Sequence, residues 1–368
     1  MVKDPEGEPD LAGFKNKGMC HEHADETFKR STGHFTINEF LRYVIKDPNI
    51  WLMLDKQQGF SDEKQKGEMI MEALDVKLQL KPKEYRSAIE PTWCAGCGDF
   101  AVTAAICNAF SQLNVNPDEA IIVSGIGCSS RLPLWMRTFG FHSCHGRALP
   151  VAIGIKLARP ELLVMVTIGD GDAFSIGGGH LPHAARRNID ITLVVMDNQI
   201  YALTKKQVSP TSREGMKGST TPYGTIDSPM NTLTMMLTYG ATFVAQAFAG
   251  NPKVTGDIIK QAIEHKGFSF VNILSPCPTF NTVDTFDYYR PRIYNIDETH
   301  RDKTDRMKAF EIAESALNHT INPEAKVPVG IFYKAEKPVY ESRVAGLKGK
   351  YHGADITDLK AIYNKFRT

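Results

Sequence analysis

The sequence predicts a doubly wound α/β domain built on a mostly parallel sheet. Two apolar runs, residues 161–168 and 189–196, have the length and the β-branched content of buried strands. Three glycines at 177–179 lead into a helical segment between them, so the pieces form a strand, helix, strand unit whose strands run parallel. Two more apolar runs, 120–127 and 268–274, have the same character and extend the predicted sheet.

Polar residues directly follow the first two of these runs. Asp170 comes after the first and Asn198 after the second. Because parallel strands end at one edge, where open α/β sheets bind ligands, the two side chains emerge together. Their oxygens suit Mg²⁺, which completes its coordination with water and ligand phosphates. Gly169 and Gly171 allow close backbone approach, and the start of a helix offers N–H groups, so the sequence predicts a site for Mg²⁺ and a diphosphate.

The composition argues against several classes of protein. The formal net charge is +1 and no long basic run occurs, which disfavours nucleic acid or an anionic membrane as the main partner. The longest apolar runs are too short to cross a bilayer, and the N-terminus lacks the pattern of a signal peptide. A cytoplasmic location is therefore expected, and 368 residues suffice for one large domain or two modest ones.

Four of the seven cysteines stand where they can converge. Cys94 and Cys97 form a CxxC pair before a predicted helix at 100–113, while Cys128 and Cys277 each follow a predicted strand. Disulfides are not expected in a reducing compartment, and the strand ends share one edge of the sheet. Four cysteines hold either Zn²⁺ or an iron–sulfur cluster. One local pair joined to two isolated cysteines beside a cofactor edge favours a [4Fe-4S] cluster over structural zinc.

Six ordered motifs make the chain resemble one family. They are W-C-A-G-C-G-D-F at 93–100, G-I-G-C-S-S-R-L-P at 125–133, H-G-R-A-L-P at 145–150, G-D-G-D at 169–172, D-N-Q-I-Y-A-L-T-K at 197–205 and S-P-C-P-T at 275–279. The G-D-G-D and D-N-Q elements resemble the thiamine diphosphate (TPP) motif. The whole set resembles the β subunit of 2-oxoacid:ferredoxin oxidoreductases over roughly residues 84–285, with a weaker match beyond, and implies the TPP-binding type of α/β fold.

The resemblance implies roles for particular residues. The cluster ligands fall on Cys94, Cys97, Cys128 and Cys277. The Mg²⁺ ligands fall on Asp170, Asn198 and the backbone carbonyl of Ile200. The residues expected around TPP are Ser129, Ser130, His145, Gly146, Arg147, Gly169, Gly171, Asp172, Tyr201, Leu203 and Thr204.

Two cations are expected to contact the substrate. The family has a basic residue three positions after the third cysteine, here Arg131, and a guanidinium can hold a carboxylate with two parallel hydrogen bonds. Lys205 follows Leu-Thr, which resembles members of the family that use 2-oxoglutarate, where a cation meets the second carboxylate. The resemblance therefore implies 2-oxoglutarate as the leading substrate, with pyruvate, branched-chain and aryl 2-oxo acids as alternatives.

The resemblance also implies a reaction and its partners. TPP, Mg²⁺ and one [4Fe-4S] cluster would support oxidative decarboxylation of the oxo acid to succinyl-CoA, with coenzyme A (CoA) as co-substrate and ferredoxin taking electrons one at a time. The reverse reductive carboxylation uses the same groups. The glutamate that activates the aminopyrimidine ring of TPP has no candidate motif here. An α subunit is therefore expected to complete the active site, in an αβ pair or its dimer.

Three regions are predicted along the chain. Residues 1–83 form an N-terminal extension, charged and disordered in its first 30 residues and carrying a short helix pair at 36–55. Residues 84–285 form the cofactor-binding domain. Residues 286–368 contain a helix at 305–318 and a strand at 327–333, and cover the cofactor edge or contact the partner subunit.

Other residues with metal-ligating or nucleophilic side chains have simpler interpretations. Cys107 lies in a helical apolar pattern and is expected to pack in the core. No separate metal site is expected at 142–145, because His145 already belongs to the expected cofactor loop. The pair His180 and His183 are expected to be ordinary polar residues, and the group at 20–23 to be part of a solvated tail.

Two rival functions share parts of this pattern. Four cysteines on structural zinc would suit a TPP-dependent non-redox lyase, and a chain that had lost catalysis would be a ferredoxin-like electron carrier. The dispersed cysteines disfavour the zinc lyase, and the intact Asp170 and Asn198 elements disfavour the carrier.

Overall fold

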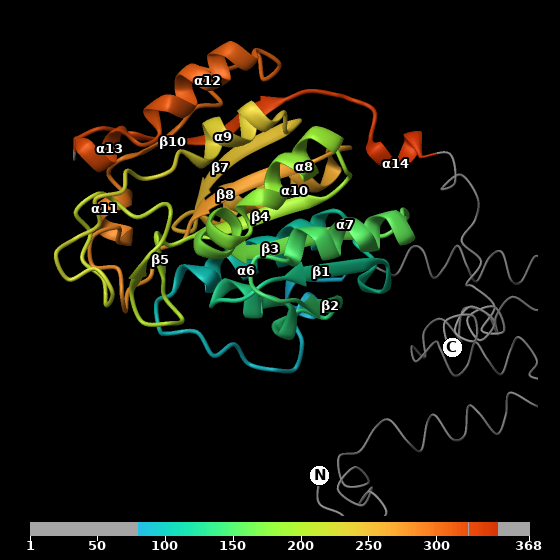
Figure 1. Cartoon of the computed structure of the whole chain (residues 1–368). Coiled ribbons are helices and arrows are strands. Elements are labelled where there is room, and N and C mark those ends of the chain that lie inside the picture. Colours follow the sequence, from blue (N-terminus) through green and yellow to red (C-terminus); the bar gives the residue numbers. More distant parts are fainter. Residues whose placement is uncertain (1–79, 323, 345–368) are drawn as a thin grey trace, which may run out of the picture. The chain divides into compact units, whose positions relative to one another are not determined.

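One sheet organises the part of the chain that the computed structural model describes, residues 80–322 and 324–344 (Figure 1). Within these residues the sheet has eight strands in the order β2-β1-β3-β4-β8-β7-β10-β9, and neighbours run parallel except β7 and β10. The strands are β1 (Ala120–Ser124), β2 (Phe139–His142), β3 (Leu163–Gly169), β4 (Thr192–Asp197), β7 (Phe243–Phe248), β8 (Ser269–Leu274), β9 (Ile293–Asn295) and β10 (Val327–Lys334). The doubly wound, mostly parallel fold is therefore confirmed.

Helices cover both faces of this sheet. One face carries α6 (Gly98–Gln112) and α10 (Pro252–Glu264), which pack against each other. The other carries α7 (Ala148–Ala158), α8 (Leu181–Arg187), α9 (Thr232–Tyr239) and α12 (Arg306–Ser315). Short elements lie in the connections: η1 (Pro82–Tyr85), η2 (Pro117–Glu119), η3 (Ser129–Trp135), η4 (Asp172–Ile176), η5 (Gly178–His180), α11 (Phe286–Tyr289), α13 (Asn318–Ile321), α14 (Tyr340–Arg343) and the hairpin β5 (Ile200–Tyr201) with β6 (Gln207–Val208).

The central strands are apolar throughout because both of their faces are buried. In β4 the side chains of Leu193 and Val195 pack with the helices of one layer. Val194 and Met196, which point the other way, pack with the opposite layer. This arrangement explains why the run reads as continuous rather than alternating in the sequence.

The predicted elements hold with shifted ends. The strand predicted from 189 begins at Thr192, because the backbone N–H of Ile191 bonds the carbonyl of Ile189 in a turn at 2.8 Å. The run that begins at 120 leaves the sheet after Ser124. The helix predicted at 305–318 divides into α12 and α13.

Helical backbone begins earlier after β3 than the glycines at 177–179 indicated. A π-helical turn, η4, follows the strand almost at once, and α8 begins only at Leu181. The bend therefore falls on the G-D-G-D segment itself, which places Asp172 inside the turn.

The described residues after β8 contact both the carboxyl edge and the amino edge of the sheet. Because β10 runs antiparallel to β7, the residues after it return to the amino ends of the parallel strands. There the N–H of Ala335 bonds the carbonyl of Thr242 at 2.9 Å, and Asn188 donates to the carbonyl of Lys337 at 3.0 Å. The predicted helix pair at 36–55 and the group at 20–23 lie outside the described residues. None of the helices in the described ranges has the length and hydropathy needed to span a membrane.

Candidate cofactor site

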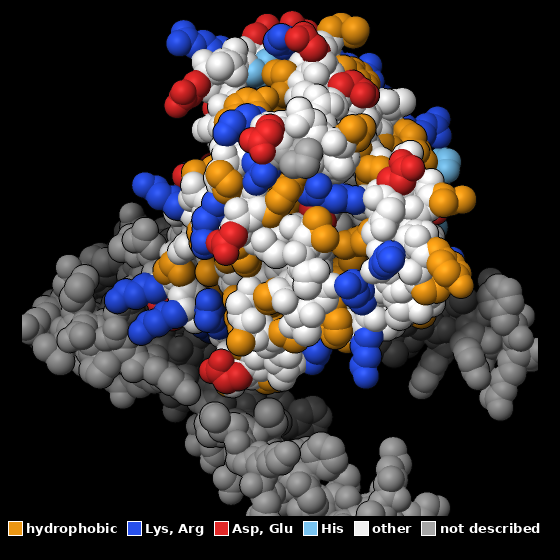
Figure 2. Space-filling view, turned by 90° about the vertical axis from the view of Figure 1, so that its left-hand side faces the viewer, with side chains coloured by type: hydrophobic (Ala, Val, Ile, Leu, Met, Phe, Trp, Pro, Cys, Tyr) orange, Lys and Arg blue, Asp and Glu red, His pale blue; other side chains and the backbone are white. Residues whose placement is uncertain are grey.

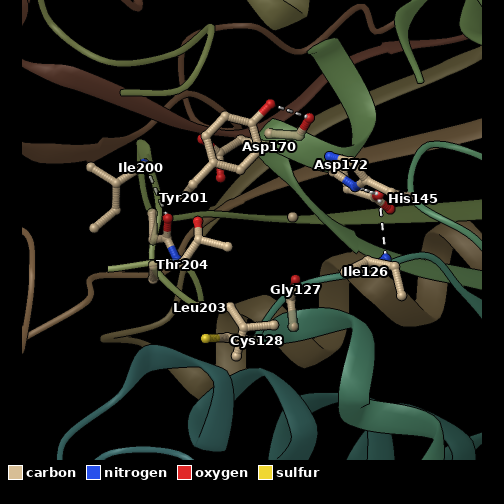
Figure 3. A pocket seen from close by; sticks show the side chains of 15 residues that line it. Ile126, Gly127, Cys128, His145, Asp170, Asp172, Ile200, Tyr201, Leu203 and Thr204 are labelled. Atoms are coloured by element: carbon tan, nitrogen blue, oxygen red, sulfur yellow. Dashed lines mark hydrogen bonds and ion pairs between the residues drawn. The ribbon is translucent and has the colours of Figure 1, made fainter. Parts of the chain in front are cut away.

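A cavity of about 180 Å³ opens at the carboxyl edge of the sheet, among the loops that follow β1, β3 and β4 (Figure 3). Twelve of its lining residues are among those predicted for TPP, Mg²⁺ or the cluster: Cys128, Ser129, His145, Gly169, Asp170, Gly171, Asp172, Asn198, Ile200, Tyr201, Leu203 and Thr204. The structure thus brings together side chains that lie up to 76 positions apart, as the parallel sheet requires.

Asp170 is held by hydroxyl groups before any ligand is considered. Its side chain is buried, and its Oδ2 accepts hydrogen bonds from Ser209 Oγ at 2.5 Å and Thr211 Oγ1 at 2.7 Å. Burial raises the pKa of this carboxyl, and the two hydroxyl bonds oppose that shift. Asn198 lines the same cavity, and its Oδ1 accepts the N–H of Ile200 at 3.1 Å.

A second buried carboxylate, Asp197, lies beside this pair. Its Oδ1 accepts from Thr211 Oγ1 at 3.0 Å and from the N–H of Gln199 at 3.1 Å. Burial, followed by the charge of Asp170, raises the pKa of Asp197 to about 8. Thr211 therefore bridges two carboxylates. Asp197 stands in the D-N-Q motif but received no predicted role. Ser209 and Thr211 were not predicted, because no local spacing shows that a loop residue returns to a strand end.

Asp172 organises the opposite wall of the cavity. Its Oδ1 accepts the N–H groups of Gly146 at 2.7 Å and Ile126 at 3.3 Å, and it pairs with His145 Nδ1 (Figure 3). Its Oδ2 is buried and has no partner among the described protein groups. A Cβ on Gly125 would overlap this carboxylate, so the approach of the loop requires glycine there.

Tyr201 closes the cavity over the G-D-G-D turn. Its hydroxyl donates to the carbonyl of Gly171 at 3.1 Å, and a Cβ on that glycine would overlap the tyrosine ring. Gly171 is therefore needed for close packing, which agrees with the expected close approach of the backbone.

The four predicted cluster cysteines lie in one neighbourhood. Cys128 lines the cavity and packs in the same apolar cluster as Cys277. The CxxC turn is closed by a bond from the N–H of Cys97 to the carbonyl of Cys94 at 3.1 Å. It is joined to the Cys277 loop by the N–H of Gly98, which donates to the carbonyl of Pro276 at 3.1 Å.

The environment of two of these thiols, Cys97 and Cys128, opposes a free thiolate. Burial raises the pKa of Cys97 above its usual range, and the charge of Asp99 adds to the shift. Burial likewise raises the pKa of Cys128 to about 11, with further contributions from Asp99 and Cys277. The charged form therefore needs a partner of opposite charge to be stable here.

The remaining predicted contacts lie outside the cavity lining. Ser130 is buried, and Arg147 donates to the carbonyls of Gly146 and Ile176, both at 3.3 Å. The guanidinium of Arg131 bonds Thr92 Oγ1 and lies 5.5 Å from the ring centre of Trp135. Lys205 follows the lining residue Thr204, and both it and Lys206 have positive φ angles, 72° and 74°.

Cys107 and His142 have structural partners. Cys107 is buried in the core with its sulfur 3.8 Å from Met136 Sδ, as predicted. His142 Nδ1 lies 2.8 Å from Ser124 Oγ and 3.0 Å from the carbonyl of Ser130. Across residues 80–322 and 324–344, no three His, Cys, Asp or Glu side chains are grouped closely enough to hold one metal ion.

The fold and this cavity define a TPP-binding enzyme domain, and the comparisons agree. A family model described as "Thiamine pyrophosphate enzyme, C-terminal TPP binding domain" matches residues 125–273. A second model, which describes the C-terminal part of the pyruvate ferredoxin oxidoreductase beta subunit, matches residues 277–349. The two matches follow each other along the chain and cover most of the described residues.

Individual relatives narrow the class to a family. The 2-oxoacid:ferredoxin oxidoreductase subunit beta of Saccharolobus solfataricus is 41% identical over 70% of this chain and 87% of its own length. The 2-oxoglutarate synthase subunit KorB of Methanocaldococcus jannaschii is 40% identical over 67% of this chain and 89% of its own. The chain therefore belongs to the family of 2-oxoacid:ferredoxin oxidoreductase β subunits.

A solved structure supports the same assignment. The 2-oxoglutarate:ferredoxin oxidoreductase from Magnetococcus marinus, solved with 2-oxoglutarate, coenzyme A and succinyl-CoA bound, contains a chain 48% identical to this one. The match covers 77% of this chain and 96% of that chain, with a TM-score of 0.69. The family, the fold and the enzyme class expected from the sequence motifs are thus confirmed.

Proposed function

We propose that this chain binds TPP, Mg²⁺ and one [4Fe-4S] cluster and, with an α subunit, converts 2-oxoglutarate and CoA to succinyl-CoA and CO₂. Each turnover passes two electrons, one at a time, to ferredoxin, and the reverse reaction uses the same site. The observation that carries the proposal is the position of Cys128, which lines the same cavity as Asp170 and Asn198. A cysteine expected to hold a redox cluster therefore lies beside the expected decarboxylation site.

The donor groups fit Mg²⁺ with a diphosphate. Asp170, Asn198 and the backbone carbonyl of Ile200 offer the hard oxygen donors that Mg²⁺ prefers, and few protein ligands leave room for phosphate oxygens. Bound TPP supplies a carbanion that adds to the 2-oxo carbon of the substrate. Thr211 and Ser209 fix the Asp170 carboxylate, and Tyr201 and Asp172 keep the G-D-G-D turn and the His145 loop in place.

The cysteine arrangement suits a cluster better than a single zinc ion. Four thiolates on one Zn²⁺ sit about 2.3 Å from the metal and hence within about 4 Å of one another. No group of that kind is found in the described ranges, although the charges of Cys94 and Cys277 both act on Cys128. One CxxC pair joined to two isolated cysteines favours an iron–sulfur cluster, which leaves the zinc lyase as the weaker alternative.

Two observations support 2-oxoglutarate as the substrate. The KorB relatives carry that substrate in their names, and the Magnetococcus enzyme was solved with it bound. Lys205, next to the cavity lining, supplies a cation for the second carboxylate, and Arg131 supplies one near the third cysteine. Pyruvate, branched-chain and aryl 2-oxo acids remain the alternatives.

The mouth of the cavity supports completion by an α subunit. Ile126 and Leu203 line the cavity and are exposed to 39% and 47%. Such apolar side chains around a cofactor site fit an interface with another protein chain. Figure 2 shows Lys and Arg side chains along the lower half of the face that includes this edge, which suits an acidic electron acceptor. We assign residues 84–285 to cofactor binding and 286–368 to cover or partner contact, in a cytoplasmic enzyme.

The substrate assignment is tested with paired lysine variants of the assembled enzyme. Lys205→Ala should raise KM for 2-oxoglutarate about tenfold or more, since a hydrogen bond to a charged group contributes about 1.5–3 kcal/mol. KM for pyruvate should change little. Lys206→Ala is the matched control, because it removes a neighbouring lysine with nearly the same backbone conformation. Equal effects of Lys205→Ala on both substrates would reject the selectivity role.

A further inference from the structure

We propose that Trp93 is a positioning residue for the cysteine site: its indole fixes the CxxC turn against the Cys128 loop and so sets the reduction potential of the bound group. The inference rests on the proposed function, because it takes the four cysteines as ligands of an iron–sulfur cluster. It concerns a side chain that neither the motif nor the cofactor cavity assigns.

The first observation is a hydrogen bond between two cysteine loops. Trp93 Nε1 donates to the backbone carbonyl of Cys128 at 2.7 Å, across 35 positions of sequence. Trp93 directly precedes Cys94, and the carbonyl belongs to a predicted ligand itself. One rigid ring therefore spans the gap between the first and third cysteines.

The second observation is how the ring is fixed. Trp93 is only 8% exposed. It packs edge to face on Trp135 with ring centres 4.1 Å apart, and on Phe100 with ring centres 5.3 Å apart. Edge-to-face contacts between aromatic rings add stability beyond the burial of their area. The donor N–H is therefore held in direction as well as in distance.

The third observation is that the CxxC turn is linked to the other two cysteine loops by different kinds of contact. The CxxC turn is tied to the Cys277 loop by backbone, through Gly98 and Pro276, and by Ser275 Oγ, which donates to Asp99 Oδ1 at 2.7 Å. Its link to the Cys128 loop runs through side chains, from Trp93 and from Arg131 to Thr92. Since the contact of Arg131 lies on the surface, the buried link is the one that Trp93 makes.

These contacts act on the cluster in two ways. Groups that orient metal ligands tune affinity and potential, and the potential of an iron–sulfur centre depends on its hydrogen bonds and solvent exposure. Without the indole N–H, the Cys128 carbonyl keeps only the longer bond from the backbone N–H of Arg131, at 3.3 Å, and the loop opens to water. Water stabilises the more negative, reduced cluster, so the midpoint potential becomes more positive.

The same packing connects the cysteine site to the proposed substrate cation. Trp135, on which Trp93 packs, lies 5.5 Å below the guanidinium of Arg131, and both belong to η3, which begins directly after Cys128. A displaced indole therefore also displaces the segment that carries Arg131. Loss of Trp93 then raises KM for the oxo acid in addition to shifting the potential.

The test is a redox titration of the assembled αβ enzyme, followed by electron paramagnetic resonance under anaerobic conditions. Trp93→Phe should retain the cluster, shift its midpoint potential positively and lose iron faster in air than the wild type. Tyr85→Phe is the matched control: it removes a buried aromatic donor to the carbonyl of Val115, at 2.7 Å, in the same apolar cluster, and among the described residues the Tyr85 hydroxyl bonds none of the four predicted cluster ligands. The control should destabilise the fold comparably and leave the potential unchanged.

A second variant covers the case in which Trp93→Phe does not assemble. The benzothiophene analogue of tryptophan, incorporated at position 93, keeps the bicyclic shape and removes only the N–H. A wild-type potential and iron-loss rate in either variant would overturn the role of Trp93 and leave the proposed function intact. Wild-type enzyme without iron and sulfide would overturn both, so the two failures are distinguishable.

Discussion

The oxygen side and the cysteine side of the cavity differ in how far the protein alone prepares them. On the oxygen side, two hydroxyls hold Asp170 and two backbone N–H groups hold Asp172. On the cysteine side, burial raises the thiol pKa values of Cys97 and Cys128. The hydrogen bonds of the proposed Mg²⁺ site are thus in place without a ligand, whereas the proposed cluster site would reach its final charge state only with a metal group bound.

The largest expected effect separates the two sides completely. Cys277→Ser should remove most of the iron and the visible absorption of the assembled enzyme, because an alcohol replaces the buried thiol proposed as a cluster ligand. The hydrogen bonds of the oxygen side do not involve Cys277, so Mg²⁺-dependent TPP binding should persist. Iron analysis and calorimetric titration with TPP measure the two properties. Loss of TPP binding together with iron would show that the two sides form one unit.

An effect of intermediate size is expected when a hydroxyl that holds Asp170 on the oxygen side is removed. Thr211→Val removes the hydroxyl shared by Asp170 and Asp197 and should weaken Mg²⁺-dependent TPP binding about 10- to 100-fold, the range for groups that orient metal ligands. Thr167→Val is the control, because its buried hydroxyl has no partner among the described groups. The control should leave binding unchanged. Similar losses in both variants would mean that general packing, and not ligand orientation, limits binding.

The smallest expected effect is a loss of folding stability in acid, caused by His265. It limits how far mild acid can be used to strip metal from one side of the cavity without unfolding the chain. Burial and the charge of Lys334 lower the pKa of His265 to about 4, while an unfolded histidine titrates near about 6.5. The unfolded chain therefore binds more protons between these values, and stability is lost as the pH falls through that window. With partial solvation, the loss is about 1–2 kcal/mol.

Denaturant unfolding at pH 7 and pH 4.5 measures this loss. His265→Gln, which cannot titrate, should show a shallower pH dependence than the wild type. If His265→Gln and the wild type lose stability with the same slope against pH, other groups cause the acid sensitivity. Mild acid could then be used to remove metal without regard to His265.

The sequence predicted what depends on strand ends and motif spacing. Continuous apolar runs located β3 and β4, and the parallel sheet then placed Asp170 and Asn198 at one cavity. The contributions of Ser209 and Thr211 could not be predicted, because a long loop brings them back to the site and its path depends on tertiary packing. The same holds for Trp93, whose partner lies 35 positions away.

The local backbone conformation after β3 and the exact strand ends could not be predicted from the sequence either. Three glycines at 177–179 indicated where a helix begins, yet the chain turns into η4 at Asp172 directly after the strand. The hydrogen bonds that Asp172 accepts from the N–H groups of Gly146 and Ile126 are tertiary contacts, which local secondary-structure propensity does not predict. Strand ends shifted for a related reason, since turns at 189–191 are closed by bonds of their own.

The positive φ angles of Lys205 and Lys206 have an energetic consequence. A left-handed conformation costs a residue with a side chain about 1 kcal/mol or more, whereas glycine adopts it freely. Two in succession subtract about 2 kcal/mol from a total stability that is only about 5–15 kcal/mol in most domains. Next to its cavity the chain therefore gives up folding free energy at two lysines, in a backbone conformation where glycine would be the relaxed choice.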